Sequence, residues 1–165
     1  MNTYKRLKNK ILTNNELDDI LLQIREKGLT IGFTNGCFDI LHKGHIRYLA
    51  DASDLADVFI IGLNTDSSVK RLKGPNRPLQ DQESRAISLS ALVFIDYVVM
   101  FGEDTPLELL KIIRPNILVK GGDYQVETIV GYDLVTSYGG KVITLPLVKG
   151  YSTTSIIKKI SSGNL

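Results

Sequence analysis

Two histidines stand three residues apart in the segment 34–45, whose sequence is TNGCFDILHKGH. On a helix, His42 and His45 share one face, and Gly44 between them lets a bulky ligand approach the backbone. Backbone N–H groups and the dipole at a helix start favour an anion, most commonly phosphate. Two imidazoles there can donate hydrogen bonds to phosphate oxygens and stabilise charge that develops on them. The segment therefore predicts phosphate chemistry.

Two other interpretations fit the residue types of this segment. The histidines could simply face solvent on a helix, although clustered histidines near a loop usually have a use for their switchable proton. A zinc site could form from Cys37, Asp39, His42 and His45, but the spacing matches none of the usual zinc-finger patterns. Phosphate handling is the favoured interpretation.

Strands and helices alternate along the chain, which predicts α/β architecture with right-handed βαβ units. Short apolar runs indicate strands over 29–34, 58–63, 97–101, 117–120 and 141–147. Helical periodicity and capping residues indicate helices over 14–25, 40–52, 81–92, 105–113 and 153–160, with a weak helical pattern over 126–138. The expected fold is a Rossmann-like, doubly wound parallel sheet, with ligands beyond the carboxyl ends of its strands.

The chain is expected to form one domain over residues 29–165, preceded by an N-terminal helical extension over 1–28. A length of 165 residues suits a single compact core. In the extension, the apolar stripe Leu17, Ile20, Leu21 and Ile24 packs either on this domain or on a second subunit. Self-packing is the favoured alternative.

Composition excludes several classes of protein. With 20 Lys plus Arg against 18 Asp plus Glu, the net charge of +2 does not suggest a dedicated nucleic-acid or membrane-surface binder. The single cysteine, Cys37, excludes an intramolecular disulfide and favours a reducing compartment. No apolar run could span a bilayer, and the polar, basic start shows no secretory signal. We therefore expect a cytoplasmic protein.

Two motifs at opposite ends of the chain resemble a known superfamily. His-x-Gly-His after a strand, together with the Ser/Thr-rich segment 151–159 before the last helix, resembles the nucleotidyltransferases that include cytidylyltransferases and pantetheine-phosphate adenylyltransferase. The longer segments 33–42, 64–74, 118–124 and 152–157 resemble the adenylyltransferase domain of bacterial ADP-heptose synthesis. The resemblance covers roughly residues 14–160, and the length leaves no space for a fused sugar kinase domain, so a stand-alone form is expected.

The resemblance implies an activity and its substrates. In that family the domain transfers AMP from ATP to D-glycero-β-D-manno-heptose 1-phosphate, giving ADP-heptose and pyrophosphate. The implied pathway is lipopolysaccharide core or another surface glycan. The expected partners are ATP and a sugar phosphate, with Mg²⁺ carried by ATP and with no nucleic acid or membrane. A homodimer is a further hypothesis from the family and the N-terminal helix.

The resemblance also assigns roles to individual residues. His42, His45 and Lys73 are assigned to catalysis, with Lys73 on a loop whose Gly74 and Pro75 suit a mobile lid. The assigned nucleotide-binding residues are Thr34, Asn35, Phe38, Lys120, Gly121, Gly122, Asp123, Ser152, Thr153 and Thr154. The assigned acceptor-binding residues are Asp39, Asp66, Arg71 and Arg85.

Each assignment has a simpler structural alternative. Asp39 could cap the following helix, Arg85 could be a surface helix residue, and a basic run is usually a solvated face. Ser152 could act only as an N-cap. No cluster of carboxylates lies near His42 in sequence, so no protein-held metal is expected.

Two competing functions share the same motifs. A cytidylyltransferase acting on glycerol phosphate or another alcohol phosphate would use the same two phosphate-binding segments. A nucleotide-binding module without catalysis would bind ATP and release no pyrophosphate. The presence of both His42 and His45 favours an enzyme.

Overall fold

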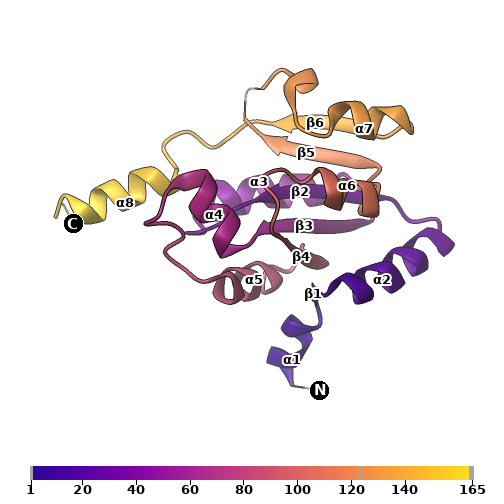
Figure 1. The fold of residues 1–165 in the computed structure, drawn as a ribbon, viewed down its shortest axis with the longest axis horizontal. Coiled ribbons are helices and arrows are strands. Elements are labelled where there is room, and N and C mark those ends of the chain that lie inside the picture. Colours follow the sequence, from indigo (N-terminus) through magenta and orange to yellow (C-terminus); the bar gives the residue numbers. More distant parts are fainter. Residues whose placement is uncertain (1, 123, 164–165) are drawn as a thin grey trace.

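One parallel sheet organises the molecule. The computed structural model describes residues 2–122 and 124–163, so the assigned residue Asp123 lies outside the described residues. Within these ranges six strands pair in the order β1-β4-β3-β2-β5-β6 (Figure 1). Their bounds are β1 Ile11–Leu12, β2 Ile31–Gly36, β3 Val58–Asn64, β4 Tyr97–Phe101, β5 Ile117–Gly121 and β6 Lys141–Leu145. The predicted Rossmann-like α/β class is confirmed.

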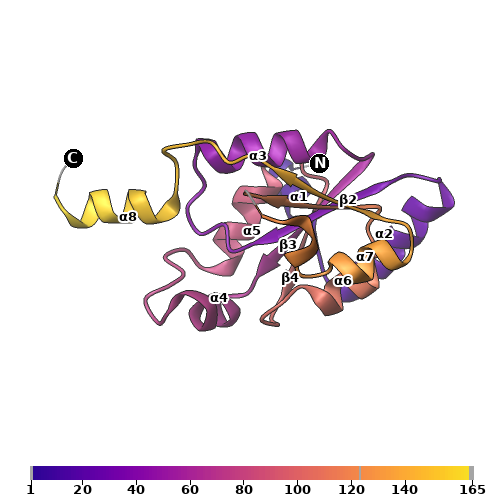
Figure 2. The ribbon, with the colours of Figure 1, turned by 90° about the horizontal axis from the view of Figure 1, so that it is seen from above.

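Helices cover both faces of the sheet, as Figure 2 shows. Their bounds are α1 Thr3–Lys8, α2 Asn14–Glu26, α3 Lys43–Ser53, α4 Asp66–Lys73, α5 Gln82–Ser90, α6 Leu107–Ile113, α7 Tyr132–Ser137 and α8 Thr153–Ser161, with a 3₁₀ turn at Val126–Thr128. Buried side chains of α2, α6 and α7 pack on one face, and those of α3 and α5 pack on the other. Because both faces are covered, the central strand β3 is buried along its whole length.

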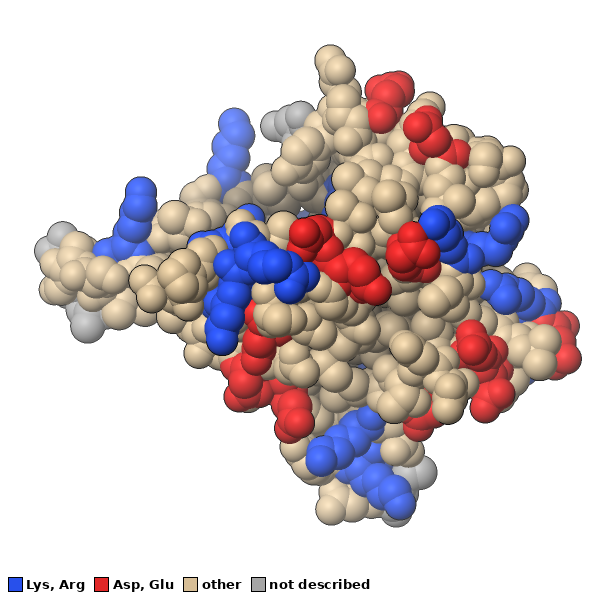
Figure 3. All heavy atoms as spheres, in the orientation of Figure 1, with Lys and Arg blue, Asp and Glu red and all other residues tan. Residues whose placement is uncertain are grey.

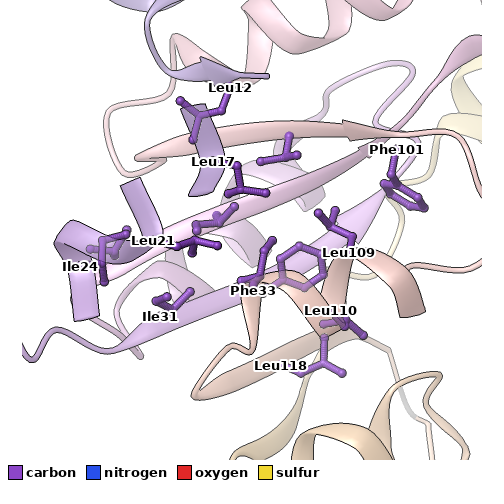
Figure 4. Close-up of a cluster of buried hydrophobic side chains, with 14 of the residues drawn as sticks. Leu12, Leu17, Leu21, Ile24, Ile31, Phe33, Phe101, Leu109, Leu110 and Leu118 are labelled. Carbon is purple, nitrogen blue, oxygen red and sulfur yellow. The ribbon is translucent and has the colours of Figure 1, made fainter. Parts of the chain in front are cut away.

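The N-terminal segment contributes to the sheet and the core. β1, which no pattern in the sequence indicates, pairs with β4 through Ile11 opposite Val98. A two-residue strand is too short to produce an alternating pattern. The stripe of α2 packs into the same cluster as strand residues (Figure 4). That stripe therefore covers the chain's own sheet.

The topological switch point lies between β2 and β5. β2 pairs with β3 on one side and with β5 on the other, so successive strands run outward in opposite directions from this pair. Ligands of such sheets bind beyond the carboxyl ends of the strands at this point. The loop after β2, residues 37–42, which we call the histidine loop, ends at His42, and His45 lies in the first turn of α3. The end of β5 carries Lys120 and Gly121.

Two elements near this edge differ from the predictions. α3 begins at Lys43 rather than Ile40, because His42 is its extended N-cap. The stretch 64–78, predicted as a loop, contains the helix α4, which Thr65 caps. The side-chain oxygen of Thr65 accepts a hydrogen bond from the backbone N–H of Ser68. The sequence therefore contains an N-cap residue that indicates the start of this helix.

No helix among the described residues is long and apolar enough to cross a membrane.

Candidate active site

The two histidine rings stack at the start of α3. Their centroids lie 3.8 Å apart with an interplanar angle of 18°. Nδ1 of His42 accepts a hydrogen bond from the backbone N–H of His45 at 3.3 Å, which caps the helix. A neutral His42 therefore carries its proton on Nε2 and can donate it to a ligand.

Close packing explains the glycine between the histidines. A Cβ atom on Gly44 would lie 3.0 Å from Nδ1 of His42 and 3.1 Å from Cβ of Tyr151. These two side chains therefore fill the space next to Gly44, which differs from the expectation that this glycine admits a ligand. Phe38 completes the arrangement, with its ring edge-on to His45 at 5.4 Å between centroids.

Both histidines are uncharged at neutral pH. Burial and, to a smaller extent, the neighbouring His42 together lower the pKa of His45 to about 4. Burial also lowers the pKa of His42. The pair can thus donate hydrogen bonds, while neutralisation of a polyanion depends on lysine and arginine side chains.

Lys120 connects the two strands at the switch point. Its Nζ donates to Oδ1 of Asn35 at 2.5 Å, from the end of β5 to the end of β2. Burial lowers the pKa of Lys120 to about 8. The structure therefore brings two predicted nucleotide-binding side chains together beside the histidine loop.

Thr34 is fully buried, and its hydroxyl is used inside the protein. Its Oγ1 lies 2.7 Å from the hydroxyl of Tyr48, which donates to the carbonyl of Val119 at 3.1 Å. Tyr48 was not predicted from the sequence, where it appears only as one aromatic residue of a helix. The Thr34 side chain therefore makes its hydrogen bond inside the protein, between β2 and α3.

The two glycines after Lys120 have different surroundings. A Cβ atom on Gly121 would lie 2.8 Å from Cδ2 of Leu147 and 3.2 Å from the ring of Tyr48. Gly122 has a φ of 128°, in the region that favours glycine. Close packing and backbone conformation thus account for both glycines.

Asp39 anchors a distant segment and does not cap α3, so the capping alternative is wrong. Its buried carboxylate accepts from the backbone N–H groups of Leu79 and Gln80 at 2.8 and 3.0 Å. Nε of Arg77 donates to the same carboxylate at 2.6 Å. Burial acts against ionisation, but these hydrogen bonds outweigh it and hold the pKa of Asp39 below its usual value.

Arg85, assigned to the acceptor phosphate, is enclosed, so the alternative of a surface helix residue is wrong. Its side chain is 0% exposed. All three guanidinium nitrogens donate internally, at 2.6 Å to the carbonyl of Cys37, 2.7 Å to Oδ1 of Asp66 and 3.1 Å to the carbonyl of Gln80. Asp66 is likewise engaged in this ion pair. Arg85 thereby joins the loop after β2 to the first turn of α4 and to the loop before α5.

The basic residues of α4 have different surroundings. Lys70, Arg71 and Lys73 occupy its last turn, and basic side chains gather over this helix (Figure 3). Arg71 pairs with Asp104 at 2.8 Å and donates to the carbonyl of Gly102, so it is engaged with the loop after β4. Burial raises the pKa of the Cys37 thiol. Nearby positive charges act in the opposite direction, and the charge of Lys73 has the largest effect among them. The positive charge of Lys73 therefore favours the ionised form of this thiol, in the loop after β2.

The Ser/Thr segment before α8 meets the histidine loop. Oγ1 of Thr153 donates to the carbonyl of Ile40 at 3.4 Å. Ser152 caps α8 by accepting from the backbone N–H of Ser155, and Thr154 is exposed. The ring of Tyr151 lies 6.5 Å from that of His42, centroid to centroid. The two predicted motifs are thus brought together from opposite ends of the chain.

The alternative zinc site is not assembled. Across residues 2–122 and 124–163, no group of three or more His, Cys, Asp or Glu side chains could hold a metal ion. The carboxylate of Asp39 is instead bonded to Arg77.

Known proteins match most of this chain. A family model described as Cytidylyltransferase-like matches residues 33–159. The bifunctional protein HldE of Syntrophotalea carbinolica is 57% identical over 151 residues, which are 92% of this chain and 31% of that protein. HldE of Trichlorobacter lovleyi is 55% identical with the same coverage. The chain therefore spans about a third of the length of these curated relatives.

Two solved structures share the architecture. The lipopolysaccharide core biosynthesis protein from Thermoplasma volcanium GSS1 has a TM-score of 0.61 and 27% identity, covering 76% of this chain and 100% of that one. Pantoate-beta-alanine ligase from Francisella tularensis has a TM-score of 0.60 and 20% identity, covering 89% and 75%. At that identity, the second likeness shows the fold alone. With its family match and its paired histidine and Ser/Thr motifs, the chain belongs to the cytidylyltransferase-like, His-x-Gly-His family of nucleotidyltransferases.

Proposed function

We propose that this protein transfers AMP from ATP to a sugar 1-phosphate, namely D-glycero-β-D-manno-heptose 1-phosphate. The observation that carries the proposal is the stacked pair of His42 and His45 at the switch point of a chain that is 57% identical to an HldE protein. The likeness to a lipopolysaccharide core biosynthesis protein favours a product used in surface-glycan assembly. Cytoplasmic location is part of the same proposal.

The reaction requires positioning and charge stabilisation. An oxygen of the acceptor phosphate forms a bond to the α-phosphorus of ATP. The bond from that phosphorus to the bridging α–β oxygen breaks, and pyrophosphate leaves with the electron pair. Negative charge develops on the α-phosphoryl oxygens and on the leaving oxygen, so fixed hydrogen-bond donors lower the barrier. No side-chain nucleophile is needed.

The described residues suit these tasks. Neutral His42 and His45 would donate hydrogen bonds to the triphosphate, and Lys73 and Lys120 would supply positive charge. The N-terminus of α8 would face the β- and γ-phosphates, because helix starts bind anions. Mg²⁺ belongs to the ATP substrate in this proposal, held by phosphate oxygens and water.

Pyrophosphate release from purified protein tests the proposal. The assay pairs ATP or CTP with heptose 1-phosphate or glycerol 3-phosphate, in the presence of Mg²⁺. We expect release only with ATP and the heptose phosphate, and a loss of about a hundredfold or more in His42→Ala and His45→Ala. Arg47→Ala, which breaks an exposed pair with Asp51, is the control for an ordinary surface change.

Each competing function predicts a different result. Turnover only with CTP and glycerol phosphate would support the cytidylyltransferase alternative. ATP binding without release of pyrophosphate from any acceptor would support a binding module.

A further inference from the structure

The guanidinium group of Arg77 is held on one side by an ion pair. It lies between α4 and α5, where its Nε bonds to Asp39 at 2.6 Å. The Asp39 side chain is 1% exposed, whereas that of Arg77 keeps 20% exposure. Among the residues that the structure describes, the two terminal nitrogens of Arg77 have no hydrogen-bond partner. A guanidinium held in this way can bind an oxyanion through two parallel hydrogen bonds.

Asp39 ties the segment that carries Arg77 to the histidine loop. Its carboxylate also accepts from the backbone N–H groups of Leu79 and Gln80. In return, Nε2 of Gln80 donates to the backbone carbonyl of Asp39 at 2.5 Å. Asp39 precedes His42 by three positions in the same loop. The position of Arg77 relative to the histidines is therefore set by a buried, ionised side chain.

The other arginines near this edge are engaged elsewhere. All three guanidinium nitrogens of Arg85 donate to protein atoms, and Arg71 is bonded to the loop after β4. The positive charge of Arg77, like that of Lys73, acts on the Cys37 thiol in the loop after β2. Arg77 is thus a guanidinium beside the histidine loop with donors still available for a substrate.

We propose that Arg77 binds the phosphate group of the acceptor and that Asp39 is the positioning residue that orients it. The inference rests on the proposed adenylyl transfer. An acceptor phosphate must bring one oxygen to the α-phosphorus of ATP against the repulsion of two anions. A guanidinium that holds the non-reacting oxygens both offsets this repulsion and fixes the direction of attack.

Steady-state kinetics with each substrate varied separately test this role. In Arg77→Ala we expect KM for heptose 1-phosphate to rise about tenfold to a hundredfold, the effect of losing a charge-assisted pair. KM for ATP should change by less than about threefold, because only the acceptor is contacted. Arg77→Lys should recover part of the lost affinity, because it restores the positive charge but not the two parallel N–H donors of a guanidinium. Arg47→Ala is the matched control, since it removes an arginine from an exposed ion pair.

The positioning role of Asp39 has its own measurement. Asp39→Asn should raise the same KM, and in an Arg77→Ala background it should add no more than about threefold, because it acts through Arg77. Fully multiplicative effects would show that Asp39 only supports the fold, and would overturn its assigned role. Thermal unfolding and circular dichroism are used to check that each variant is folded. Arg77→Lys is the conservative variant that tests the contact with Asp39.

Failure of this inference is distinguishable from failure of the proposed function. If the wild type uses another sugar 1-phosphate, the heptose assignment fails and Arg77 is tested with that acceptor. If no acceptor is turned over, calorimetric binding of heptose 1-phosphate in the presence of a non-hydrolysable ATP analogue replaces the rate. Acceptor KM or binding that is unchanged in Arg77→Ala, an effect on ATP alone, or no binding to the wild type would each overturn the role of Arg77.

Discussion

Nδ1 of His42 caps the helix that carries His45, and the two rings stack with their centroids 3.8 Å apart. One contact therefore fixes the helix start, the ring orientation and the tautomer of His42. The Nε2–H that remains is the donor available to a ligand. Burial keeps both rings neutral, so the site contains hydrogen-bond donors on the histidines and positive charge on neighbouring lysine and arginine residues.

Gly44→Ala tests whether this stacking is needed. The added Cβ would lie 3.0 Å from Nδ1 of His42, closer than side chains ordinarily approach, and so would displace the ring. We expect a folded protein with turnover reduced about tenfold or more, because misplacing a reacting group is costly. Gly102→Ala is the control, since its Cβ would meet Thr65 at an ordinary 3.7 Å. Equal turnover in the two variants would contradict the role of the stack.

Lys120 predicts how kcat/KM depends on pH. Its pKa of about 8 in the free enzyme means that the ammonium group is charged below this pH and loses its proton above it. If the charge assists binding of the triphosphate, kcat/KM for ATP falls as the pH rises above about 8. Lys120→Arg should move that decline to higher pH, because a guanidinium stays ionised. A decline that stays at the same pH would assign it to another group.

A double-mutant cycle tests the support beneath the site. Tyr48→Phe keeps the packed ring but leaves the hydroxyl of Thr34 without its buried partner. We expect the free energy of unfolding to fall by about 1–3 kcal/mol, the cost of an unsatisfied buried group. Adding Thr34→Val removes that unsatisfied group, so the double variant should recover part of the loss. Purely additive losses in chemical denaturation would show that the two hydroxyls are independent.

Arg85 is predicted to matter for stability. Arg85→Ala leaves Asp66 and two carbonyls without their donor, so we expect the free energy of unfolding to fall by about 3 kcal/mol. Arg47→Ala breaks an exposed pair and should cost less than about 0.5 kcal/mol. Urea denaturation of both variants measures the difference. A loss in Arg85→Ala as small as that in Arg47→Ala would contradict the structural role.

The sequence predicted the fold class well, because strongly apolar strands and capped helices carry local signals. β3 is buried throughout and reads as a continuous apolar run, and Thr13 caps α2 with the reciprocal contact from Glu16. β1 was missed because two residues give no periodicity. α4 was missed because its polar composition resembles that of a loop, although Thr65 provides a cap.

The site was only partly predictable for a different reason. Motif spacing locates His42, His45 and the Ser/Thr segment, but it does not reveal which charges neutralise one another across the fold. Arg85 and Arg77 are both arginines in or near the same basic stretch of sequence. Tertiary contacts bury the first against the carbonyl of Cys37 and leave the second partly exposed on Asp39. Contacts between residues so far apart in the chain leave no recognisable pattern in the sequence around either residue.

Following the α-phosphorus of ATP tests adenylyl transfer by this protein directly. Protein, Mg²⁺, heptose 1-phosphate and ATP labelled at the α-phosphate are incubated, and the products are separated. We expect the label to appear in an ADP-sugar, with unlabelled pyrophosphate formed in equal amount, and His42→Ala to abolish most of both products. Absence of labelled ADP-sugar, or equal formation in the His42→Ala protein, would contradict adenylyl transfer at this site.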